Sequence, residues 1–262
     1  MTERHDELLE RQRDHFNSIA DRYHEARQGQ NHLYLKDRMW RDVFSDLDDF
    51  RGRHIDVLEP MCGFCDGLDI ISNHLTANFN YKGFDYSDSV VEIVRRERPG
   101  IDVSQADATK YLPPENAFDL IIIIGGLHHT PRDAAKIVTN LAPALRSGGA
   151  FVSFEPTHGN PIFKKIRNQI YRSNSLFDAH TEQAFPVSEL IEMFHQTGLR
   201  LRKILYPGLL SYVLYYNPDA FPFLNIGGRG LVDATYALDK LFYNNVIGRT
   251  LSFATLSVWT RP

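Results

Sequence analysis

The sequence lacks the features that mark three large classes of protein. Its 262 residues include only two cysteines, Cys62 and Cys65, which excludes a disulfide framework and fits a reducing compartment. Its longest nearly uncharged apolar run, Ile204 to Tyr216, contains a proline and a glycine and is too short to span a bilayer. The formal net charge of −4 argues against a protein that neutralises phosphates, so we expect no nucleic-acid partner.

The rest of the composition is that of a globular protein with a sizeable core. Hydrophobic residues make up 43% and charged residues 24%, which excludes intrinsic disorder and a fibrous fold. The first residues alternate in charge where a secretory signal would need an apolar run, so we expect a cytoplasmic protein. The length fits one large domain better than two independent ones.

The spacing of apolar residues predicts two amphipathic helices and then an alternation of strands and helices. The first two helices are expected over 3–26 and 33–50. The predicted strands are His54–Glu59, Tyr81–Asp85, Asp102–Gln105, Phe118–Ile124, Ala150–Glu155, Leu199–Leu205 and Leu251–Trp259. The predicted helices between them are Gly67–Ala77, Ser89–Arg98, Pro131–Leu145 and Val187–Thr197. This alternation is typical of an α/β protein with a mostly parallel sheet.

We therefore predict a single domain over residues 1–262, with a seven-stranded sheet and helices on both of its faces. Residues 1–50 would form an N-terminal helical lid, and residues 51–205 and 246–262 the core. Residues 206–245, rich in Tyr, Phe, Pro and Gly, would form a C-terminal cap insert over the carboxyl edge of the sheet. Open α/β sheets bind their ligands at that edge.

Acidic residues follow three successive predicted strands at this edge. The first strand ends V-L-E-P-M-C-G-F-C-D-G, which places Glu59 before a strand-to-helix turn. Asp85 follows the second strand, where a carboxylate can accept hydrogen bonds from ribose hydroxyls, and Asp107 follows the third. Such a series suits a cofactor with a cationic amino-acid end and an adenosine, and it disfavours a polyphosphate such as a dinucleotide.

The order and spacing of these pieces resemble the class I S-adenosylmethionine-dependent methyltransferases. The matching segments are V-L-E-P-M-C-G, G-F-D-Y-S, Q-A-D-A, F-D-L-I-I-I-I-G-G-L-H-H-T and L-A-P-A-L-R-S-G-G-A-F-V-S-F-E-P. The resemblance implies a Rossmann-like fold, S-adenosylmethionine as cofactor and S-adenosylhomocysteine as product. It also implies an enzyme that methylates a small-molecule, sugar or lipid-linked acceptor, with O-, N- and C-methylation all open.

The resemblance also implies a role for individual residues. Glu59 and the backbone around Met61 and Gly63 would hold the methionine end, with Gly125 beside it, while Asp85 would hold the ribose. The remaining implied contacts are Tyr86 on one face of the adenine, Asp107 and the Ala108 amide at its edge, and Tyr23 closing over the cofactor with Arg27 near its carboxylate.

The first motif departs from the family pattern of three alternating glycines. Only Gly63 remains, with Met61 and Cys65 in the outer places. Because of this departure, a second hypothesis is a module that binds the cofactor without turnover. The C-G-F-C turn allows a third hypothesis, a thiol-disulfide redox protein, although both cysteines are also explained as small residues that fill a turn.

The candidates for a catalytic base are His128 and His129, which follow the predicted central strand. One of them could instead pack structurally, and Glu155 or His158 could supply the base; His180 lies in the segment after the fifth predicted strand. We expect no metal ion, because adjacent histidines without a nearby carboxylate or thiolate cluster make a poor metal motif.

Two segments bear on the acceptor. The basic stretch F-K-K-I-R-N-Q-I-Y-R, residues 163–172, could meet an anionic substrate such as a phosphate-linked glycan, could meet an acidic membrane, or could be a solvated helix face. The aromatic insert could enclose an apolar substrate, touch a membrane as a peripheral contact, pair two chains as a homodimer, or simply pack as a cap.

Overall fold

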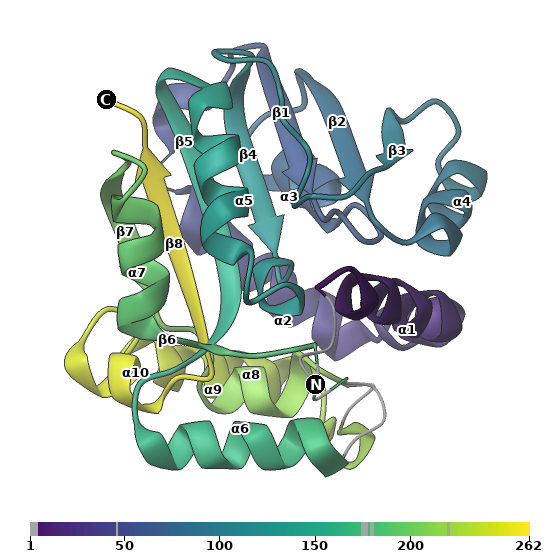
Figure 1. Ribbon diagram of the computed structural model, residues 1–262. Helices are drawn as coiled ribbons and strands as arrows, with labels where there is room; N and C mark the ends of the chain where they lie inside the picture. The colour runs from purple at the N-terminus through teal and green to yellow at the C-terminus, as the bar shows by residue number, and fades with distance from the viewer. Residues whose placement is uncertain (1–4, 46, 174–177, 179–180, 219–220) are drawn as a thin grey trace.

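The computed structural model describes residues 5–45, 47–173, 178, 181–218 and 221–262, and its centre is one mixed β-sheet (Figure 1). The sheet has eight strands: seven follow the order β3-β2-β1-β4-β5-β8-β7, and β6 pairs with β5 outside this path. The strands are β1 (Ile55–Pro60), β2 (Phe79–Asp85), β3 (Val103–Gln105), β4 (Phe118–Ile124), β5 (Leu145–His158), β6 (Phe185–Pro186), β7 (Arg200–Leu205) and β8 (Ala254–Thr260).

The sheet is parallel except at one strand. β8 runs antiparallel to both of its neighbours, β5 and β7, whereas the pairs from β3 through β5 are parallel. The chain moves outward from β1 to β3 and then returns to β4 on the other side of β1. The connections after β1 and β4 therefore leave the sheet in opposite directions, which is the place where open α/β sheets bind ligands.

The central strand β4 is buried on both faces. Leu120 and Ile122 belong to one core cluster and Ile121 and Ile123 to the other, because successive side chains of a strand point to opposite faces. Its one charged residue, Asp119, accepts hydrogen bonds from Arg146 at 2.5 Å and from the Asp56 amide at 2.9 Å. These two hydrogen bonds offset the cost of placing a carboxylate in an otherwise apolar strand.

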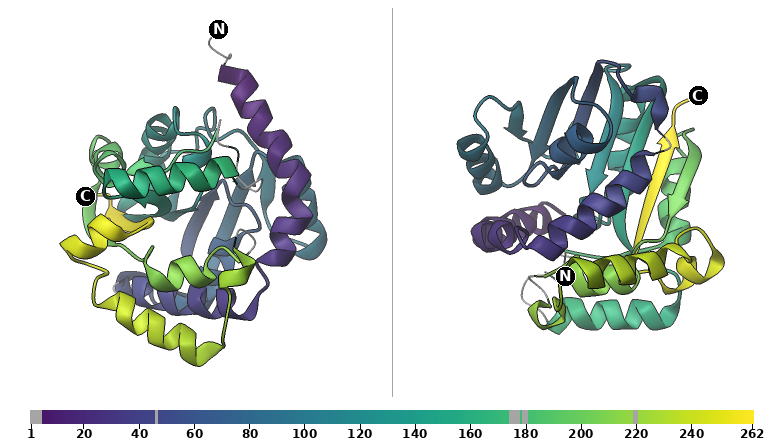
Figure 2. Two further views of the ribbon diagram at one scale, coloured as in Figure 1. Left: turned by 90° about the horizontal axis from the view of Figure 1, so that it is seen from below. Right: turned by 180° about the vertical axis from the view of Figure 1, so that it is seen from behind.

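Helices cover both faces of the sheet, and further helices lie at its carboxyl edge (Figures 1 and 2). One core cluster joins the sheet to α2, α3, α8 and α9, and the other joins it to α5 and α7. Seen from below, α1, α6 and α8 surround the carboxyl ends of the parallel strands (Figure 2). The helices are α1 (His5–Ala26), α2 (Gln30–Phe44), α3 (Asp66–His74), α4 (Asp88–Glu97), α5 (Ala134–Leu141), α6 (Pro161–Ser173), α7 (Val187–His195), α8 (Leu210–Tyr215), α9 (Arg229–Lys240) and α10 (Val246–Leu251).

The structure corrects the prediction of a seven-stranded sheet. The eighth strand, β6, has only two residues, and it pairs with Thr157 and His158 at an extension of β5. A two-residue strand carries no periodic pattern, so sequence reasoning cannot see it. The start of β5 was also missed, because Leu145 was assigned to the preceding helix although it pairs with Phe118.

α6 lies in the basic stretch for which a helix face was one of the alternatives, and three further helices lie where none was predicted, α8 and α9 in the insert and α10 after it. α8 and α10 have six residues each, which is less than two turns, so they show no helical period in the sequence. α9 is longer and buries Val232, Thr235, Tyr236 and Asp239 at helical spacing, so its pattern was open to prediction.

The insert after β7 packs against the core through its tyrosines. Tyr212, Tyr215 and Tyr216 of α8 and Tyr236 of α9 are all buried. The large apolar side chains that remain outside include Phe223, at 74% exposure, and Ile226, at 59%. No helix among the described residues is long and apolar enough to cross a membrane.

Candidate active site

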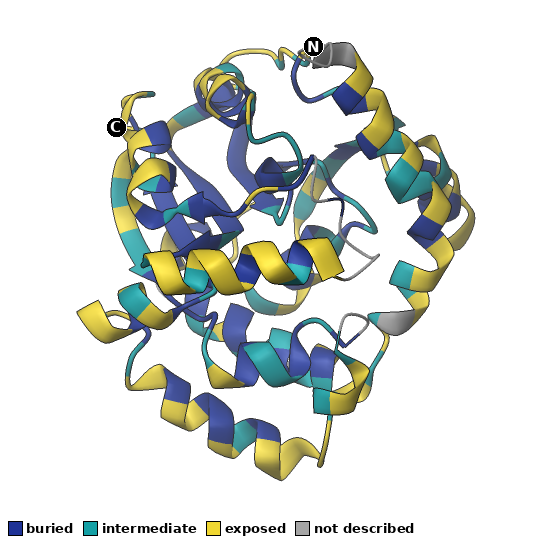
Figure 3. Ribbon diagram, turned by 60° about the horizontal axis from the view of Figure 1, so that its bottom comes forward, coloured by how far each residue is buried: buried dark blue, intermediate teal, exposed yellow. Residues whose placement is uncertain are grey.

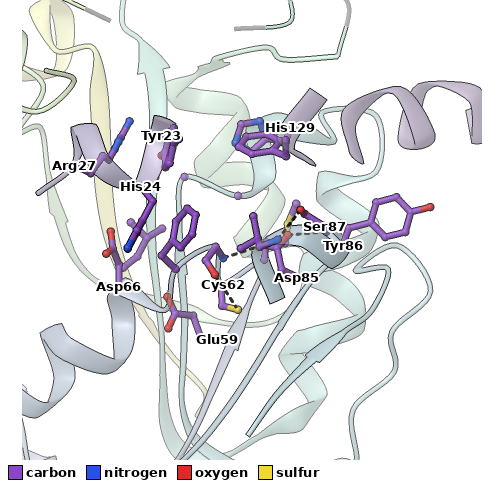
Figure 4. A pocket seen from close by; sticks show the side chains of 18 of the residues that line it. Tyr23, His24, Arg27, Glu59, Cys62, Asp66, Asp85, Tyr86, Ser87 and His129 are labelled. Atoms are coloured by element: carbon purple, nitrogen blue, oxygen red, sulfur yellow. Dashed lines mark hydrogen bonds between the residues drawn. The ribbon is translucent and has the colours of Figure 1, made fainter. Parts of the chain in front are cut away.

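A cavity of about 480 Å³ lies at the carboxyl edge of the sheet, between the strand ends and α1. Along α1, Gln12, Phe16, Tyr23 and Arg27 line it at helical spacing, so one face of the helix forms a wall of the cavity. In Figure 4, Tyr23 and His129 lie on one side of the cavity and Glu59, Cys62 and Asp85 on the other. Every residue predicted to bind the cofactor lines this cavity, and His129 does as well.

Three alternating residues of the turn after β1 have a left-handed backbone, although only one of them is a glycine. Met61, Gly63 and Cys65 have φ values of 53°, 51° and 62°, all in the left-handed region. For a residue with a Cβ this conformation costs on the order of 1 kcal/mol, so Met61 and Cys65 hold it against their own preference. The Cys62 amide anchors the turn by donating to the Phe84 carbonyl at 2.9 Å.

Glu59 is buried beneath this turn and braces it. Its carboxylate accepts hydrogen bonds from the Gly67 amide at 2.9 Å and the Tyr81 hydroxyl at 2.6 Å. Burial raises the pKa of Glu59 well above its ordinary value. A Cβ on Gly67 would lie 2.7 Å from the carboxylate, so this approach requires glycine.

Asp85 ties the end of β2 to the same turn. Its carboxylate accepts hydrogen bonds from the Gly63 amide at 2.9 Å and the Ser87 amide at 3.0 Å. Burial raises the pKa of Asp85, and these amides act in the opposite direction. The carboxylate oxygens have further lone pairs, so the geometry lets Asp85 accept hydrogen bonds from a ligand as well.

Asp107, Ala108 and Thr109, which follow β3, also line the cavity. Asp107 accepts hydrogen bonds from the amide and hydroxyl of Thr109, and Ala108 beside it is buried. Tyr86 lines the cavity, but its ring points away from the other labelled side chains (Figure 4). Its hydroxyl donates to Glu10 at 2.5 Å, and its pKa is raised to about 12, chiefly by burial.

The loop after β4 is held by a buried carboxylate that the strand after it supplies. Glu155 of β5 accepts hydrogen bonds from the amides of Gly126 and Leu127 at 3.0 and 2.9 Å, and it lies 3.0 Å from His128 Nδ1. Burial raises the pKa of Glu155 to about 8 and lowers that of His128 to about 3. His128 and Glu155 stand behind the cavity wall and do not line it.

His129 lies at the cavity surface, and three elements position it. Its Nδ1 accepts a hydrogen bond from Gln12 at 2.9 Å, and its ring packs edge-on against Phe16 with centroids 4.7 Å apart. Glu182, from the segment before β6, lies 3.7 Å from the same nitrogen. Burial lowers the pKa of His129 well below its ordinary value, so its imidazole is neutral at physiological pH.

The fold brings a carboxylate to the two histidines, which the argument against a metal ion did not foresee. One ligand atom each from His128, His129 and Glu182 lies within 4.8 Å of the others. Burial raises the pKa of Glu182 to about 8, so its carboxyl is mostly protonated at neutral pH and would have to lose that proton to bind a metal. Within the described part of the chain, this group is the one whose ligand atoms lie close enough together to hold a metal ion.

Both cysteines are buried in the turn, with their sulfurs 3.9 Å apart. Cys65 has no exposed surface and Cys62 only 5%. A redox-active thiol needs access to its partner protein, so this burial favours the interpretation that the cysteines fill the turn.

Sequence reasoning missed several residues of the site and proposed others that lie elsewhere. Gln12, Phe16 and Glu182 surround His129, and Tyr81 braces Glu59. The spacing of Gln12, Phe16 and Tyr23 on one face of α1 could have pointed to the first two. His158 does not line the cavity, and His180 lies outside the described residues.

The chemistry of the cavity fits S-adenosylmethionine. Carboxylates at the ends of β1, β2 and β3 suit a ribose diol, an adenine amine and a cationic amino-acid end, and they disfavour phosphates. Gly63 adds an open approach, because a Cβ there would meet nothing within 4 Å.

Comparisons with known proteins agree with this fit. Residues 57–149 match the family model described as a methyltransferase domain. A demethylmenaquinone methyltransferase of Bacillus cytotoxicus is 23% identical over 212 residues, which cover 72% of this chain and 87% of that protein.

Two solved structures share the fold. The YcgJ protein of Bacillus subtilis has a TM-score of 0.58 at 17% identity, covering 86% of this chain and 98% of that one. An S-adenosylmethionine-dependent methyltransferase of Mesorhizobium loti has a TM-score of 0.57 at 17% identity, covering 85% and 97%. The family match over residues 57–149 identifies a methyltransferase domain in this chain, and the strand order and the two structures show that it has the fold of S-adenosylmethionine-dependent methyltransferases.

Proposed function

We propose that this enzyme methylates a small-molecule acceptor that binds between α1 and the loop after β4. The observation that carries the proposal is the placement of His129 and the strand-end carboxylates around one cavity. The Bacillus cytotoxicus relative, whose name gives a small-molecule acceptor, supports the substrate class. A cytoplasmic enzyme of small-molecule biosynthesis is part of the proposal.

The proposed cofactor contacts divide the cavity into two ends. Asp85 would hold the ribose, Asp107 and the Ala108 amide the adenine edge, and Tyr86 an adenine face once its ring turns inward from Glu10. When bound, S-adenosylmethionine supplies a methyl group that its sulfonium already activates. The protein then has to hold the acceptor in line and exclude water.

The methionine end would lie against the strained turn and the loop after β4. The residues proposed for it are Glu59, Met61, Gly63 and Gly125, with Tyr23 and Arg27 of α1 closing over it. Arg27 lies over the Tyr23 ring, with its guanidinium carbon 4.2 Å from the ring centroid, and it donates to Asn217 after α8. This contact joins the N-terminal helix to the insert, which supports a lid and a cap that close the site together.

We propose His129 as the residue that orients the acceptor and receives its proton as the methyl group is transferred. In the neutral ring Nε2 carries the hydrogen while Nδ1 accepts from Gln12, so the acceptor hydroxyl or amine would bind at Nδ1 in place of Gln12 and pass its proton to that nitrogen. His128 and Glu155 would position the loop that carries His129. The proposed reaction needs no metal ion.

Membrane contact and pairing of two chains through the insert are proposals that rest on Phe223 and Ile226. The buried tyrosines are unavailable for either contact. Co-sedimentation with lipid vesicles tests membrane contact, and light scattering tests pairing, each with Phe223→Ser compared with the unchanged protein. If the two proteins behave alike in both measurements, the insert is not a contact surface.

The proposal is tested by calorimetric titration with S-adenosylmethionine and S-adenosylhomocysteine, with and without reductant. We expect a micromolar dissociation constant that does not depend on reductant and that survives the double change Cys62→Ser with Cys65→Ser. Loss of binding in that double variant, with its fold intact, would favour the redox alternative. Release of S-adenosylhomocysteine with hydroxyl- and amine-bearing small molecules, followed by mass analysis of the product, then separates O-, N- and C-methylation from a silent binding module.

A further inference from the structure

Helix α6 buries an arginine on the face that it turns toward the protein. Its buried side chains are Arg167 and Tyr171, while Ile162 and Ile166 are 70% and 42% exposed. Phe163, on the same face as Arg167, packs against Phe253 with ring centroids 4.5 Å apart, and Figure 3 shows α6 exposed along most of its length. Arginines of a surface helix normally stay in water, so Arg167 is the unusual residue of this face.

The basic stretch on this helix divides into two parts with different environments. Lys164, Lys165 and Arg172 are exposed and agree with a solvated helix face. Arg167 is only 8% exposed and faces the body of the protein. The basic stretch is therefore a solvated helix face at Lys164, Lys165 and Arg172, but Arg167 is not part of that face.

Among the described residues, no carboxylate forms an ion pair with Arg167, and its Nε is buried without a hydrogen-bond partner. One Nη donates to the Phe253 carbonyl, which already accepts the Thr157 amide at 3.0 Å. Buried charges are normally paired, so a guanidinium held this way lacks the anion that would compensate it.

Arg167 does not line the cavity, but it lies at the carboxyl end of β5, beyond Glu155, because the Phe253 carbonyl that it contacts also accepts the Thr157 amide. The guanidinium lies 5.8 Å from the centre of the Tyr171 ring and 5.2 Å from that of Phe253. Its charge, together with that of the cavity residue Arg27, acts on His128, whose neighbour His129 lines the cavity. Glu182, the nearby acid, instead accepts the Asp178 amide and lies against His129.

We propose that Arg167, with Tyr171 beside it, receives an anionic oxygen group, a carboxylate or a phosphate, carried by the methyl acceptor. Arginine suits this task because its planar fork of donors matches both groups, and a site shielded from water strengthens the contact. The inference rests on the proposed function, since it assigns the acceptor of the same site.

Thermal unfolding of the full chain saturated with S-adenosylhomocysteine tests the inference. The proteins compared are the unchanged chain, Arg167→Met, Arg167→Lys, and Lys165→Met as a control that removes an exposed cation from the same helix. The probes are inorganic phosphate, 4-hydroxybenzoate and the neutral 4-hydroxybenzyl alcohol. The anionic probes distinguish phosphate from carboxylate, and comparison between variants cancels the general effect of salts on stability.

We expect Arg167→Met to melt at or above the temperature of the unchanged protein when no probe is present, because the substitution removes an uncompensated buried charge. At least one anionic probe should raise the melting temperature of the unchanged chain and of Lys165→Met, raise it less for Arg167→Lys, and not raise it for Arg167→Met. The neutral alcohol should produce no difference between variants.

Three results would overturn the inference. Melting of Arg167→Met about 5 °C or more below the unchanged protein would show that Arg167 is structural. Equal shifts in all variants, or no shift with either anion, would show that no anion binds there. Calorimetric binding of S-adenosylhomocysteine is measured separately, so its absence would count against the proposed function and not against this assignment alone.

Discussion

The two ends of the active-site cavity are built in different ways. At the cofactor end, Asp85 and Asp107 stand directly after neighbouring strands, and their partners are backbone amides a few residues away in the chain or one strand over. At the acceptor end, His129 contacts Gln12 from α1 and Glu182 from the segment before β6. The first end depends on short connections at a sheet edge, and the second depends on segments that only the finished fold brings together.

Buried polar atoms without hydrogen-bond partners occur at both proposed ends. Glu59 and Asp85 accept hydrogen bonds from amides and a hydroxyl, but Asp107 Oδ2 at the proposed cofactor end is buried without a hydrogen-bond partner. The same holds for one oxygen of Glu182 beside His129 and, outside the cavity lining, for Arg167 Nε. Both ends therefore hold polar atoms that a ligand can satisfy.

The largest expected effect separates the two ends by activity. His129→Ala should lower turnover about 100-fold or more, because it removes the group proposed to orient the acceptor and receive its proton. Binding of S-adenosylhomocysteine should stay unchanged, as should both quantities in the control His54→Ala, whose histidine is exposed. Unchanged turnover in His129→Ala would make this histidine structural.

The reverse separation comes from Asp85. Asp85→Ala should weaken binding of S-adenosylhomocysteine by about 1 to 3 kcal/mol, because it leaves ribose hydroxyls and the Gly63 amide without their acceptor. Calorimetry against Asp102→Ala, which removes an exposed carboxylate, measures the effect. Equal affinities in the two variants would take Asp85 out of the ribose site.

The buried carboxyls of the acceptor end should make stability depend on pH. Burial raises the pKa values of Glu155 and Glu182 to about 8, so the folded state holds protons that the unfolded chain has already lost. This stabilisation is present at low pH and disappears as the pH rises through 8, whereas the low pKa values of His128 and His129 act in the opposite sense only below about pH 6.5. The free energy of unfolding should therefore fall by about 2 kcal/mol per carboxyl between pH 6.5 and 8.

Urea unfolding across this pH range measures the fall. Glu182→Gln should remove the part of the fall that is due to Glu182. The control Glu115→Gln, at an exposed position, should leave the fall unchanged. A pH profile of Glu182→Gln that matches that of the unchanged protein would mean that Glu182 is ionised in the folded state.

The smallest expected effect concerns the strained turn of the cofactor end. Cys65→Gly should be more stable than Cys65→Ala by about 1 kcal/mol, because glycine adopts a φ of 62° without a Cβ clash. Both variants lose the buried sulfur of Cys65, so this loss cancels when their free energies of unfolding are compared. Urea unfolding measures the difference. If alanine were the more stable of the two, the left-handed conformation at this position would be wrong.

The two ends of the cavity also differ in how much of them could be predicted from the sequence. Glu59, Asp85 and Asp107 could be found from sequence because a strand, its end and the next turn are adjacent in the chain. Helices α8 and α10 were too short to show a helical period and β6 was too short to show a strand period, whereas α6 lies in the basic stretch for which a helix face was one alternative. The expectation of no metal was argued from an absent carboxylate, and Glu182 reaches the histidines from outside their local segment.

The sequence by itself determined the alternation of strands and helices, the apolar central strand and the carboxylates at the strand ends, because each of these depends on neighbours in the chain. It also carried the departure from the glycine pattern at Met61 and Cys65, but only the structure showed that both residues have a left-handed backbone. The tertiary structure alone decided which cation of the basic stretch is buried and which carboxyl meets His129. Burial and long-range contact depend on how separate elements pack, and no local pattern encodes them.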